Sequence, residues 1–312
     1  MKTILITGSN GLLGQKLVYA LLKRNNISAN WNIIATARGA NRLKVQDGYI
    51  YAEMNIGDRS SVESVLTKFK PGVVINTAAM TNVDACETAR EEAELLNATS
   101  VQFMIATLTS LQNSDSTYKC HFIHLSTDFI FDGENGPYEE TDMPNPLSHY
   151  AATKLRGEVF AMQKAVKWSI LRTIIVYGIA DDMSRSNLVL WAKGALEKGN
   201  KINVVNDQFR SPTLAEDLAE GCILCAEKSA EGIFNISGEK TYSILDLVYK
   251  VADYWKLDKS LITPSSSVGI NQPAKRPPRT GFIIDKAKQV LGYRPHSFEE
   301  GLAVLDAQLK NR

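Results

Sequence analysis

Tyr150 and Lys154 are the two side chains of this sequence that most clearly suit a chemical reaction. They lie four residues apart in the stretch HYAATKLRGE, so a helix would place them on one face. A phenol has a reference pKa of about 10, and a neighbouring ammonium favours the phenolate and lowers that value. The pair therefore suits a tyrosine that gives a proton to a carbonyl oxygen while a hydride arrives at the carbon.

This spacing is common on surface helices, so its place in the chain decides how it is interpreted. The pair follows the apolar run HFIHLS, which we predict to be a strand and which leads into Ser126, Thr127 and Asp128. The carboxyl ends of parallel strands point into the ligand crevice of an α/β sheet. We therefore expect the hydroxyl of Thr127 or Ser126 to hydrogen-bond the same carbonyl oxygen.

Three glycines mark a second candidate site near the start of the chain. Gly8, Gly11 and Gly14 follow the predicted strand KTILIT and open a predicted helix. In this setting the first glycine allows a tight turn, the second lets the backbone approach a pyrophosphate, and the third lets helix and strand pack closely. The free N–H groups and the positive dipole end of the helix then face the phosphates. We predict that this turn binds a dinucleotide.

The end of the next predicted strand bears on which dinucleotide is bound. Sites that prefer NADH usually carry an acid there for the ribose 2′-hydroxyl, and IIATARGANRL has none. Arg38 and Arg42 could instead hold a 2′-phosphate through charge-assisted hydrogen bonds. We therefore expect NADPH as the cofactor, with NADH as the alternative if both arginines are simply solvated.

Short apolar runs and longer helical stretches alternate over the first half of the chain. Such alternation is typical of βαβ units, which build a parallel sheet with helices on both faces. Because crossovers are right-handed, we predict the α/β fold class with a doubly wound parallel Rossmann sheet. The predicted strands span 2–7, 32–37, 72–78, 121–126 and 168–178, and the predicted helices span 14–25, 59–69, 89–111 and 148–165.

After Gly178 the alternation loosens, and we predict a smaller C-terminal α/β lobe. We place a dinucleotide-binding domain at 1–178, with 202–236 returning to it, and a mainly substrate-binding lobe at 179–312. The predicted helices of this part span 186–199, 214–227, 241–257 and 297–309, and the predicted strands span 201–205 and 232–237. Its basic residues either neutralise the phosphates of a substrate or form solvated loops. These residues are Arg210, Lys275, Arg276 and Arg279.

The composition excludes several other classes of protein. The chain has 312 residues, 22% of them charged, and a net charge of +1, so no charge excess favours a nucleic acid or a membrane as partner. No apolar run approaches the roughly 18 residues of a membrane span. The first apolar run ends in glycines rather than in a cleavage site for a signal peptide. We therefore expect a cytoplasmic protein.

The cysteines and histidines do not point to a metal site. Cys222 and Cys225 have C-x-x-C spacing, but they fall in an apolar helical run with no second ligand pair, as expected of buried thiols. His121 and His124 lie among apolar strand residues, as expected of core histidines. We predict no metal ion.

Taken in order along nearly the whole chain, the motifs resemble those of the extended short-chain dehydrogenase/reductases. The finer resemblance is to the dTDP-4-dehydrorhamnose reductases. The matching segments are NTAAMTNVDACE, LLNATS, STDFIFDG, NPLSHYAATKLRGE, LRTIIVYG, VVNDQFRSPT and KRPPRTG. Their joint order, more than any single segment, makes the resemblance specific.

The resemblance implies that NAD(P)H reduces the C4 carbonyl of a nucleotide-linked 4-keto-6-deoxyhexose. Tyr150 would be the general acid, Lys154 would lower its pKa and hold the nicotinamide ribose, and Thr127 would orient the carbonyl. Asn97 would support Lys154 through the helix backbone and water, and Asp128 would contact the substrate or cap its loop. The implied cofactor-binding residues are Gly8, Asn10, Gly11, Leu12, Gly14, Arg38, Asn55, Ile56, Thr77, Ala78, Ala79, Asn97, Tyr150 and Lys154.

Three departures from the family pattern bear on the identity of the sugar. Met80 stands where a Tyr is common, Ile175 where a Trp is common, and Arg279 with its neighbouring Thr where Asn-Ser is usual. Two other functions stay open. One is a non-catalytic regulatory subunit of the methionine adenosyltransferase type, against which the intact Tyr–Lys pair argues. The other is an extended reductase, epimerase or dehydratase that acts on another sugar or ketone. A homodimer is compatible with the sequence, which does not fix the oligomeric state.

Overall fold

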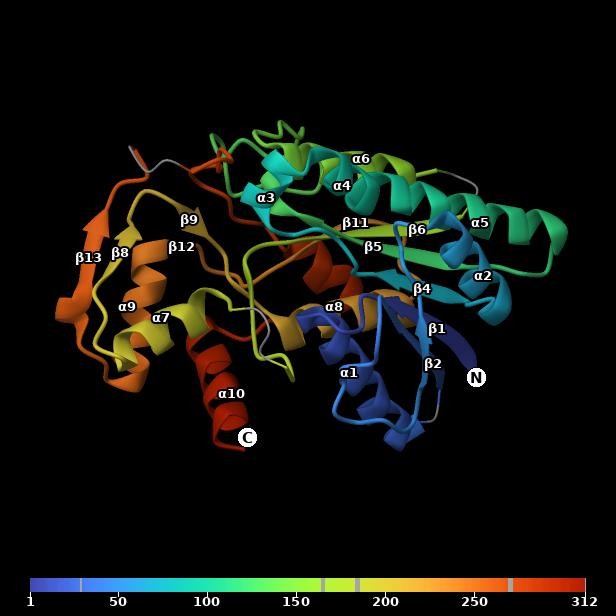
Figure 1. Cartoon of the computed structure of the whole chain (residues 1–312), viewed down its shortest axis with the longest axis horizontal. Helices are drawn as coiled ribbons and strands as arrows, with labels where there is room; N and C mark the ends of the chain where they lie inside the picture. The colour runs from blue at the N-terminus through green and yellow to red at the C-terminus, as the bar shows by residue number, and fades with distance from the viewer. Residues whose placement is uncertain (29, 164–165, 183–185, 269–271, 312) are drawn as a thin grey trace.

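Seven parallel strands form the central sheet of the molecule (Figure 1). The computed structural model describes residues 1–28, 30–163, 166–182, 186–268 and 272–311. Across the sheet the strand order is β11-β6-β5-β4-β1-β2-β3. The strands are β1 (Lys2–Thr7), β2 (Trp31–Ala37), β3 (Ile50–Glu53), β4 (Val73–Asn76), β5 (His121–Thr127), β6 (Lys167–Thr173) and β11 (Gly232–Ile236). The order reverses between β1 and β4, so the predicted α/β fold with a doubly wound Rossmann sheet is confirmed.

Helices cover both faces of this sheet and make it the middle of three layers (Figure 1). On one face α1 (Leu12–Ser28) packs against α8 (Ala215–Glu227), where Cys222 and Cys225 are buried in the core as predicted. On the other face lie α2 (Arg59–Phe69), α5 (Ser100–Ser114) and α6 (His149–Ala161). Because both of their faces are covered, the inner strands β1, β4 and β5 bury apolar side chains on each face.

The smaller lobe has its own apolar core, formed mainly by three helices. They are α7 (Leu188–Glu197), α9 (Ile244–Trp255) and α10 (Phe298–Lys310). Three two-stranded sheets complete it: β7 (Val176–Tyr177) with β10 (Thr213–Leu214), β9 (Phe209–Arg210) with β12 (Tyr242–Ser243), and β8 (Ile202–Val205) with β13 (Ile262–Ser265). In Figure 1 this lobe lies at the opposite end of the molecule from α2 and α5.

The chain passes between the two parts more than once. It returns to the central sheet as α8 and β11, and β11 pairs with β6 as expected for 232–237. The expectation that 202–205 also returns is wrong. β8 pairs with β13, and Ile202 and Val204 are buried in the core of the lobe. Its backbone and its apolar side chains therefore find their partners within the smaller lobe.

Other differences from the predicted elements have simple physical causes. The sequence does not predict β3, because this edge strand, IYAE, is half exposed and lacks an apolar run. The predicted helix 89–111 is divided into α4 (Arg90–Glu94), a π-helical turn over Leu95–Thr99, and α5. Residues 164–165, at the end of the predicted helix 148–165, lie outside the described residues.

Short elements complete the fold. They are α3 (Val83–Thr88), 3₁₀ turns over Asp128–Ile130 and Lys259–Leu261, and a π-helical turn over Ala287–Leu291. Among the helices of the described residues, none has both the length and the apolar composition that a bilayer span requires.

A buried ion pair fixes α6, the helix of Tyr150 and Lys154, to β6. Arg172 donates from Nε to Glu158 Oε1 at 3.0 Å and from Nη2 to Oε2 at 2.8 Å, and both side chains are almost fully buried. Arg172 also donates to the carbonyl oxygen of Glu140 at 3.2 Å. Removing one partner of such a pair leaves an uncompensated buried charge.

We expect Glu158→Gln to lower the free energy of unfolding by about 3 kcal/mol, because Arg172 then keeps its charge without a counter-charge. Urea denaturation followed by circular dichroism measures the change. The matched control is Glu63→Gln, which breaks an exposed pair with Arg59 on α2 and should have a much smaller effect. Equal losses in the two variants would show that the buried pair does not hold α6 in place.

Candidate active site

The glycine turn between β1 and α1 is packed so closely that side chains are excluded from it. Gly8 has a φ of +68°, and a Cβ on it would lie 3.0 Å from backbone atoms of Ala78. A Cβ on Gly14 would lie 2.3 Å from the carbonyl oxygen of Gly8 and 2.6 Å from Cα of Ser9. The start of α1 therefore lies directly on the end of β1, the arrangement that brings a helix N-terminus to a phosphate.

Side-chain hydrogen bonds join the ends of β1 and β4 next to this turn. The Thr7 hydroxyl donates to Asn76 Oδ1 at 2.6 Å and accepts from the backbone N–H groups of Thr77 and Ala78, each at 3.1 Å. The Thr77 hydroxyl in turn donates to the carbonyl oxygen of Thr7 at 2.6 Å. The loop 77–79, which the sequence predicts to line the cofactor, is therefore held beside the glycine turn.

The loop after β2 is tied to the glycine turn through Asn10. The Asn10 side chain donates to the carbonyl oxygen of Ala40 and accepts from the backbone N–H of Arg42, both at 2.9 Å. Arg38 follows β2 directly and is exposed, whereas the Arg42 guanidinium lies 3.3 Å from Asp182. Asn10 therefore positions the loop that carries the two predicted phosphate-binding arginines.

Glu53 is an acidic residue of this region that the sequence does not assign. It ends β3 in register with Ala37, and its carboxylate accepts from the backbone N–H of Gly39 at 3.0 Å. Since β3 carries no sequence signal, the position of this acid beside Arg38 is visible only in the fold. The edge formed by β2 and β3 thus offers both a guanidinium and a carboxylate to a ribose.

The remaining predicted cofactor residues lie at the same edge of the sheet. Leu12 begins α1, Asn55 follows β3 and accepts from the Gly57 N–H at 3.1 Å, and Ile56 is buried. The fold therefore gathers the predicted residues of the first four strands at their carboxyl ends. Their contacts with a dinucleotide stay a prediction.

Tyr150 and Lys154 lie on the first turns of α6, and both side chains are buried. Ser148 begins this helix by accepting from the Ala151 N–H at 3.3 Å. The Lys154 ammonium donates to the carbonyl oxygen of Leu125 at 2.6 Å. α6 thus places its lysine against the last residues of β5.

Burial controls the proton affinity of both side chains. It raises the pKa of Tyr150, and the charge of Asp128 raises it further, whereas a hydrogen bond with the Thr127 hydroxyl lowers it. Burial also lowers the pKa of Lys154 to about 8, and Glu158 opposes that shift. The sequence predicts that Lys154 lowers the pKa of Tyr150; here Thr127 has that effect. Tyr150 therefore keeps its proton at neutral pH, the state a general acid needs.

Asp128 orients the hydroxyl of Thr127. Thr127 donates to Asp128 Oδ1 at 3.1 Å and accepts from the Phe129 N–H at 3.2 Å, while Thr280 donates to the other oxygen of Asp128. A carboxylate only accepts, so the Thr127 hydrogen points to Asp128 in this arrangement. Ser126 points to the opposite face of the strand, so Thr127 is the hydroxyl that meets Tyr150.

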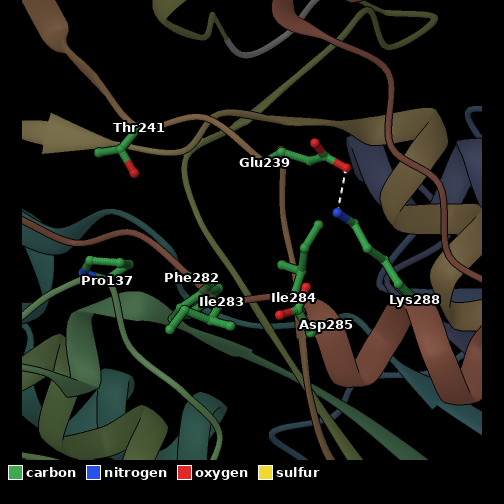
Figure 2. Close-up of a pocket in the computed structure, with 8 residues that line it drawn as sticks. All are labelled: Pro137, Glu239, Thr241, Phe282, Ile283, Ile284, Asp285 and Lys288. Atoms are coloured by element: carbon green, nitrogen blue, oxygen red, sulfur yellow. Dashed lines mark ion pairs between the residues drawn. The ribbon is translucent and has the colours of Figure 1, made fainter.

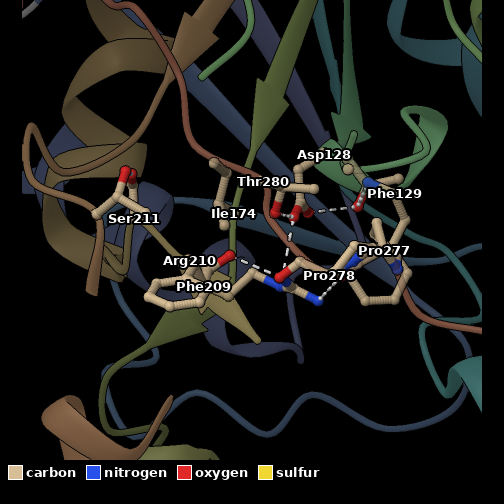
Figure 3. Close-up of polar contacts among 12 residues, drawn as sticks. Asp128, Phe129, Ile174, Phe209, Arg210, Ser211, Pro277, Pro278 and Thr280 are labelled. Carbon is tan, nitrogen blue, oxygen red and sulfur yellow. Dashed lines mark hydrogen bonds and ion pairs between the residues drawn. The ribbon is translucent and has the colours of Figure 1, made fainter. Parts of the chain in front are cut away.

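Asp128 is paired with Arg210 of the smaller lobe (Figure 3). The Arg210 Nε lies 3.8 Å from Asp128 Oδ2, and both side chains are buried. The other guanidinium nitrogens donate to the carbonyl oxygens of Phe209 at 2.7 Å, Pro277 at 2.8 Å and Pro278 at 3.3 Å. Arg210 therefore ties the loop 277–280 to Asp128, which follows β5. Because these contacts occupy its guanidinium, Arg210 is not free to bind a phosphate, contrary to one of the two hypotheses from the sequence.

The other basic candidates of this lobe differ in their exposure. Arg276 is bound to Asp84, with Nη1–Oδ1 at 3.1 Å and Nη2–Oδ2 at 2.7 Å. Arg279 is exposed and stacks over the ring of Phe209, 4.0 Å from its centroid, and Lys275 is exposed. Lys275 and Arg279 are therefore the exposed members of this set.

Asn97 lies in the π-helical turn before α5. Its side chain accepts from the Met80 N–H at 2.8 Å and donates to the Met80 carbonyl oxygen at 3.0 Å and to Thr153 Oγ1 at 3.1 Å. Asn97 thus clamps the loop after Ala79 to α6. Its support of Lys154 stays a prediction.

Two of the departures from the family pattern, Met80 and Ile175, have distinct surroundings in the fold. Met80 packs with Tyr150 and the buried thiol of Cys86. Ile175, between β6 and β7, has a φ of +28°, a left-handed backbone conformation that strains a β-branched residue. Met80 therefore places an apolar side chain beside Tyr150, whereas Ile175 holds a strained backbone between β6 and β7.

A separate hollow of about 290 Å³ lies between the loop at Pro137 and the segment 282–288 (Figure 2). An ion pair of 2.6 Å between Glu239 and Lys288 lies at its side. Its lining includes none of the predicted catalytic or cofactor residues. The strand ends, rather than this hollow, therefore define the candidate active site.

Comparison with known proteins assigns the family. Residues 1–310 match the RmlD substrate-binding domain. The chain belongs to the RmlD family. The probable low-salt glycan biosynthesis reductase Agl14 of Haloferax volcanii is 29% identical over 306 residues, which cover 97% of this chain and 96% of that protein. Methionine adenosyltransferase 2 subunit beta of Bos taurus is 29% identical over 280 residues, which cover 87% of this chain and 78% of that protein.

A solved structure agrees over the full length of this RmlD-family chain. It is dTDP-4-dehydrorhamnose reductase from Bacillus anthracis in complex with NADP, with a TM-score of 0.83 and 25% identity, covering 99% of this chain and 100% of that chain. The resemblance predicted from the motifs is therefore confirmed.

We expect Arg210→Met to destabilise the protein by about 3 kcal/mol at neutral pH, because Asp128 then stays buried without its counter-charge. Burial already raises the pKa of Asp128, and losing Arg210 raises it further. When a carboxyl has a higher pKa in the folded than in the unfolded state, stability falls as pH rises through the interval between them. The destabilisation should therefore shrink on acidification toward about pH 4, the unfolded value.

Urea denaturation at about pH 5 and about pH 7.5 measures this pH-dependent part. The matched control is Arg279→Met, which removes an exposed guanidinium stacked on Phe209 and should have a small effect that does not change with pH. A loss in Arg210→Met that is the same at both pH values would contradict the pairing with Asp128.

Proposed function

We propose that this protein is an NADPH-dependent reductase of a nucleotide-linked 4-keto-6-deoxyhexose. The observation that carries the proposal is the buried Tyr150, which lies beside Thr127 at the same edge of the sheet as the glycine turn. A phenol that keeps its proton can donate it to a carbonyl oxygen when a hydride reaches the carbon. Membership of the RmlD family and similarity to an NADP-bound dTDP-4-dehydrorhamnose reductase support the cofactor and the sugar.

The residues at the sheet edge fit a dinucleotide. Gly8 and Gly14 let the start of α1 lie directly on the end of β1, where the helix N-terminus would meet a pyrophosphate. Arg38 is exposed directly after β2, where a ribose 2′-phosphate would lie. Bound there, NADPH would supply the hydride. Because Glu53 lies beside the same turn, NADH is the alternative cofactor.

Proton transfer would follow from the charges of the cluster. Tyr150 gives its proton to the carbonyl oxygen, because the alkoxide formed by hydride addition is a stronger base than the phenolate. Lys154, charged below its pKa of about 8, offsets the phenolate and holds the ribose. Thr127 turns its hydroxyl to the carbonyl, and Arg210 and Thr280 remain to satisfy Asp128. Lys275 and Arg279 face the substrate diphosphate.

A second candidate function rests on the 29% identity to methionine adenosyltransferase 2 subunit beta. As a regulatory subunit the chain would bind a partner enzyme and would need no turnover of its own. The presence of Thr127, Tyr150 and Lys154 together favours the reductase, because binding a partner does not require them.

The reductase predicts oxidation of NADPH when the pure chain is mixed with dTDP-4-keto-6-deoxy-L-mannose. Tyr150→Phe should lower kcat at least about 100-fold, the lower scale of general acid catalysis, with little change in NADPH binding. Loss of NADPH absorbance measures the rate. Tyr249→Phe, on α9 of the other lobe, is the control and should keep the unaltered kcat. No turnover by the unaltered chain would instead favour the regulatory subunit.

The cofactor assignment is tested separately at Arg38. We expect Arg38→Ala to raise the KM for NADPH about tenfold and to leave the KM for NADH nearly unchanged, because only NADPH carries the 2′-phosphate. Glu53→Gln removes a neighbouring negative charge and should not raise the KM for NADPH. A lower KM for NADH than for NADPH in the unaltered chain would overturn the assignment.

A further inference from the structure

A basic hollow lies at the amino ends of the strands, at the opposite end of the sheet from the active site. It has a volume of about 330 Å³, and its lining includes Lys2, Lys119, Lys167 and His121. β5 begins at His121 and ends at Thr127, so about 20 Å of strand separates the hollow from the catalytic hydroxyl. The proposed reductase uses none of these four residues.

The register of the sheet places two of the lysines on the same face as His121. His121 pairs with Lys167 of β6 and with Val73 of β4, and Val73 pairs with Ile4, two residues after Lys2. Residues paired in a parallel sheet share a face, as do residues two apart in one strand. Lys2, His121 and Lys167 therefore project from one face at the strand ends, with Lys167 beside His121 and Lys2 on the far side of β4.

Three exposed lysines bring positive charge to this hollow. Within the described ranges, no carboxylate lies within ion-pair distance of Lys2, Lys119 or Lys167. Burial lowers the pKa of His121 to about 4, and the charges of Lys167 and Lys2 add to that shift. Cations that converge on one hollow attract an anion.

His121 also carries a buried nitrogen that lacks a partner. Its Nε2 lies 2.7 Å from Ser169 Oγ, and because Ser169 donates to the carbonyl oxygen of Ala230, Nε2 holds the proton of the neutral ring. Nδ1 therefore presents a lone pair. No described residue hydrogen-bonds it, although the side chain is only 3% exposed. An unpaired buried acceptor is costly, and a ligand that donates a hydrogen bond removes that cost.

We propose that this hollow binds a phosphate monoester. The oxyanion oxygens contact the ammonium groups of Lys2, Lys119 and Lys167, and the P–OH of the monoanion donates to Nδ1 of His121. A phosphate monoester has its second pKa at about 6, so the monoanion is present near neutral pH. The hollow is also within the size range of small-molecule sites, which leaves room for an organic group.

Titration of the full chain, labelled with ¹⁵N in its histidine rings, tests the site. The chain has four histidines, and His121→Gln identifies the resonances of His121. The probes are inorganic phosphate and ribose 5-phosphate at constant ionic strength. We expect a saturable shift of the Nδ1 resonance of His121, with the other three rings unchanged. Sulfate has no hydroxyl to donate near neutral pH, so it should shift the Nδ1 resonance of His121 far less.

Charge-removing variants give the second readout. Lys2→Gln combined with Lys167→Gln should raise the Kd for ribose 5-phosphate at least about tenfold, because two charged hydrogen bonds are lost. The matched control combines Lys23→Gln with Lys198→Gln, two lysines exposed elsewhere, and should leave the Kd unchanged. Urea midpoints confirm that both variants are folded. Three results would overturn the proposal, because each would indicate general charge screening. They are a resonance shift that does not saturate, a shift that sulfate reproduces, and an equal rise of the Kd in both double variants.

Discussion

A parallel sheet covered on both faces confines polar chemistry to its two ends. In β1, β4 and β5 the apolar residues are almost fully buried, and the backbone groups are paired with neighbouring strands. Each covering helix runs back against its strand, so helix N-termini gather at the carboxyl edge and helix C-termini at the amino edge. The glycine turn can hold a phosphate with backbone N–H groups at the first edge. At the second edge the helix dipoles disfavour anions, so only side chains such as Lys2 and Lys167 can attract one.

The edge of the sheet that carries the candidate active site depends on both parts of the chain. Thr127 belongs to the central sheet, but its hydroxyl is oriented by Asp128, which in turn contacts Arg210 and Thr280 of the smaller lobe. Arg210 is held by the carbonyl oxygens of Pro277 and Pro278, so its place depends on the path of that loop. A movement of the smaller lobe when substrate binds would therefore reach Thr127 through two buried contacts. This coupling gives Asp128 a role that neither of its two sequence-based hypotheses contains.

Much of the fold could be predicted because it depends on local periodicity and on buried apolar runs. The central strands, the glycine turn and the helix of Tyr150 and Lys154 all carry such signals. β3 carries none, because an edge strand needs few apolar residues, and Glu53 is hidden with it. β8 has a clear strand pattern, but the choice between β13 and the central sheet depends on contacts distant in sequence. The pairing of Arg210 with Asp128 and the direction of the pKa shift of Tyr150 also depend on tertiary contacts, so residue spacing alone could not predict them.

The raised pKa of Tyr150 fits the direction of the proposed reaction. A general acid must still hold its proton when the ketone binds, and burial keeps the proton on Tyr150 at neutral pH. A bound reduced nicotinamide would be neutral and would bring no positive charge to Tyr150, so burial would keep the proton in place. Once it has supplied the hydride it would be positive, and Lys154 would add to that charge in stabilising the phenolate that proton donation leaves behind. The low dielectric around Tyr150 strengthens both effects, because charges interact more strongly where water is excluded.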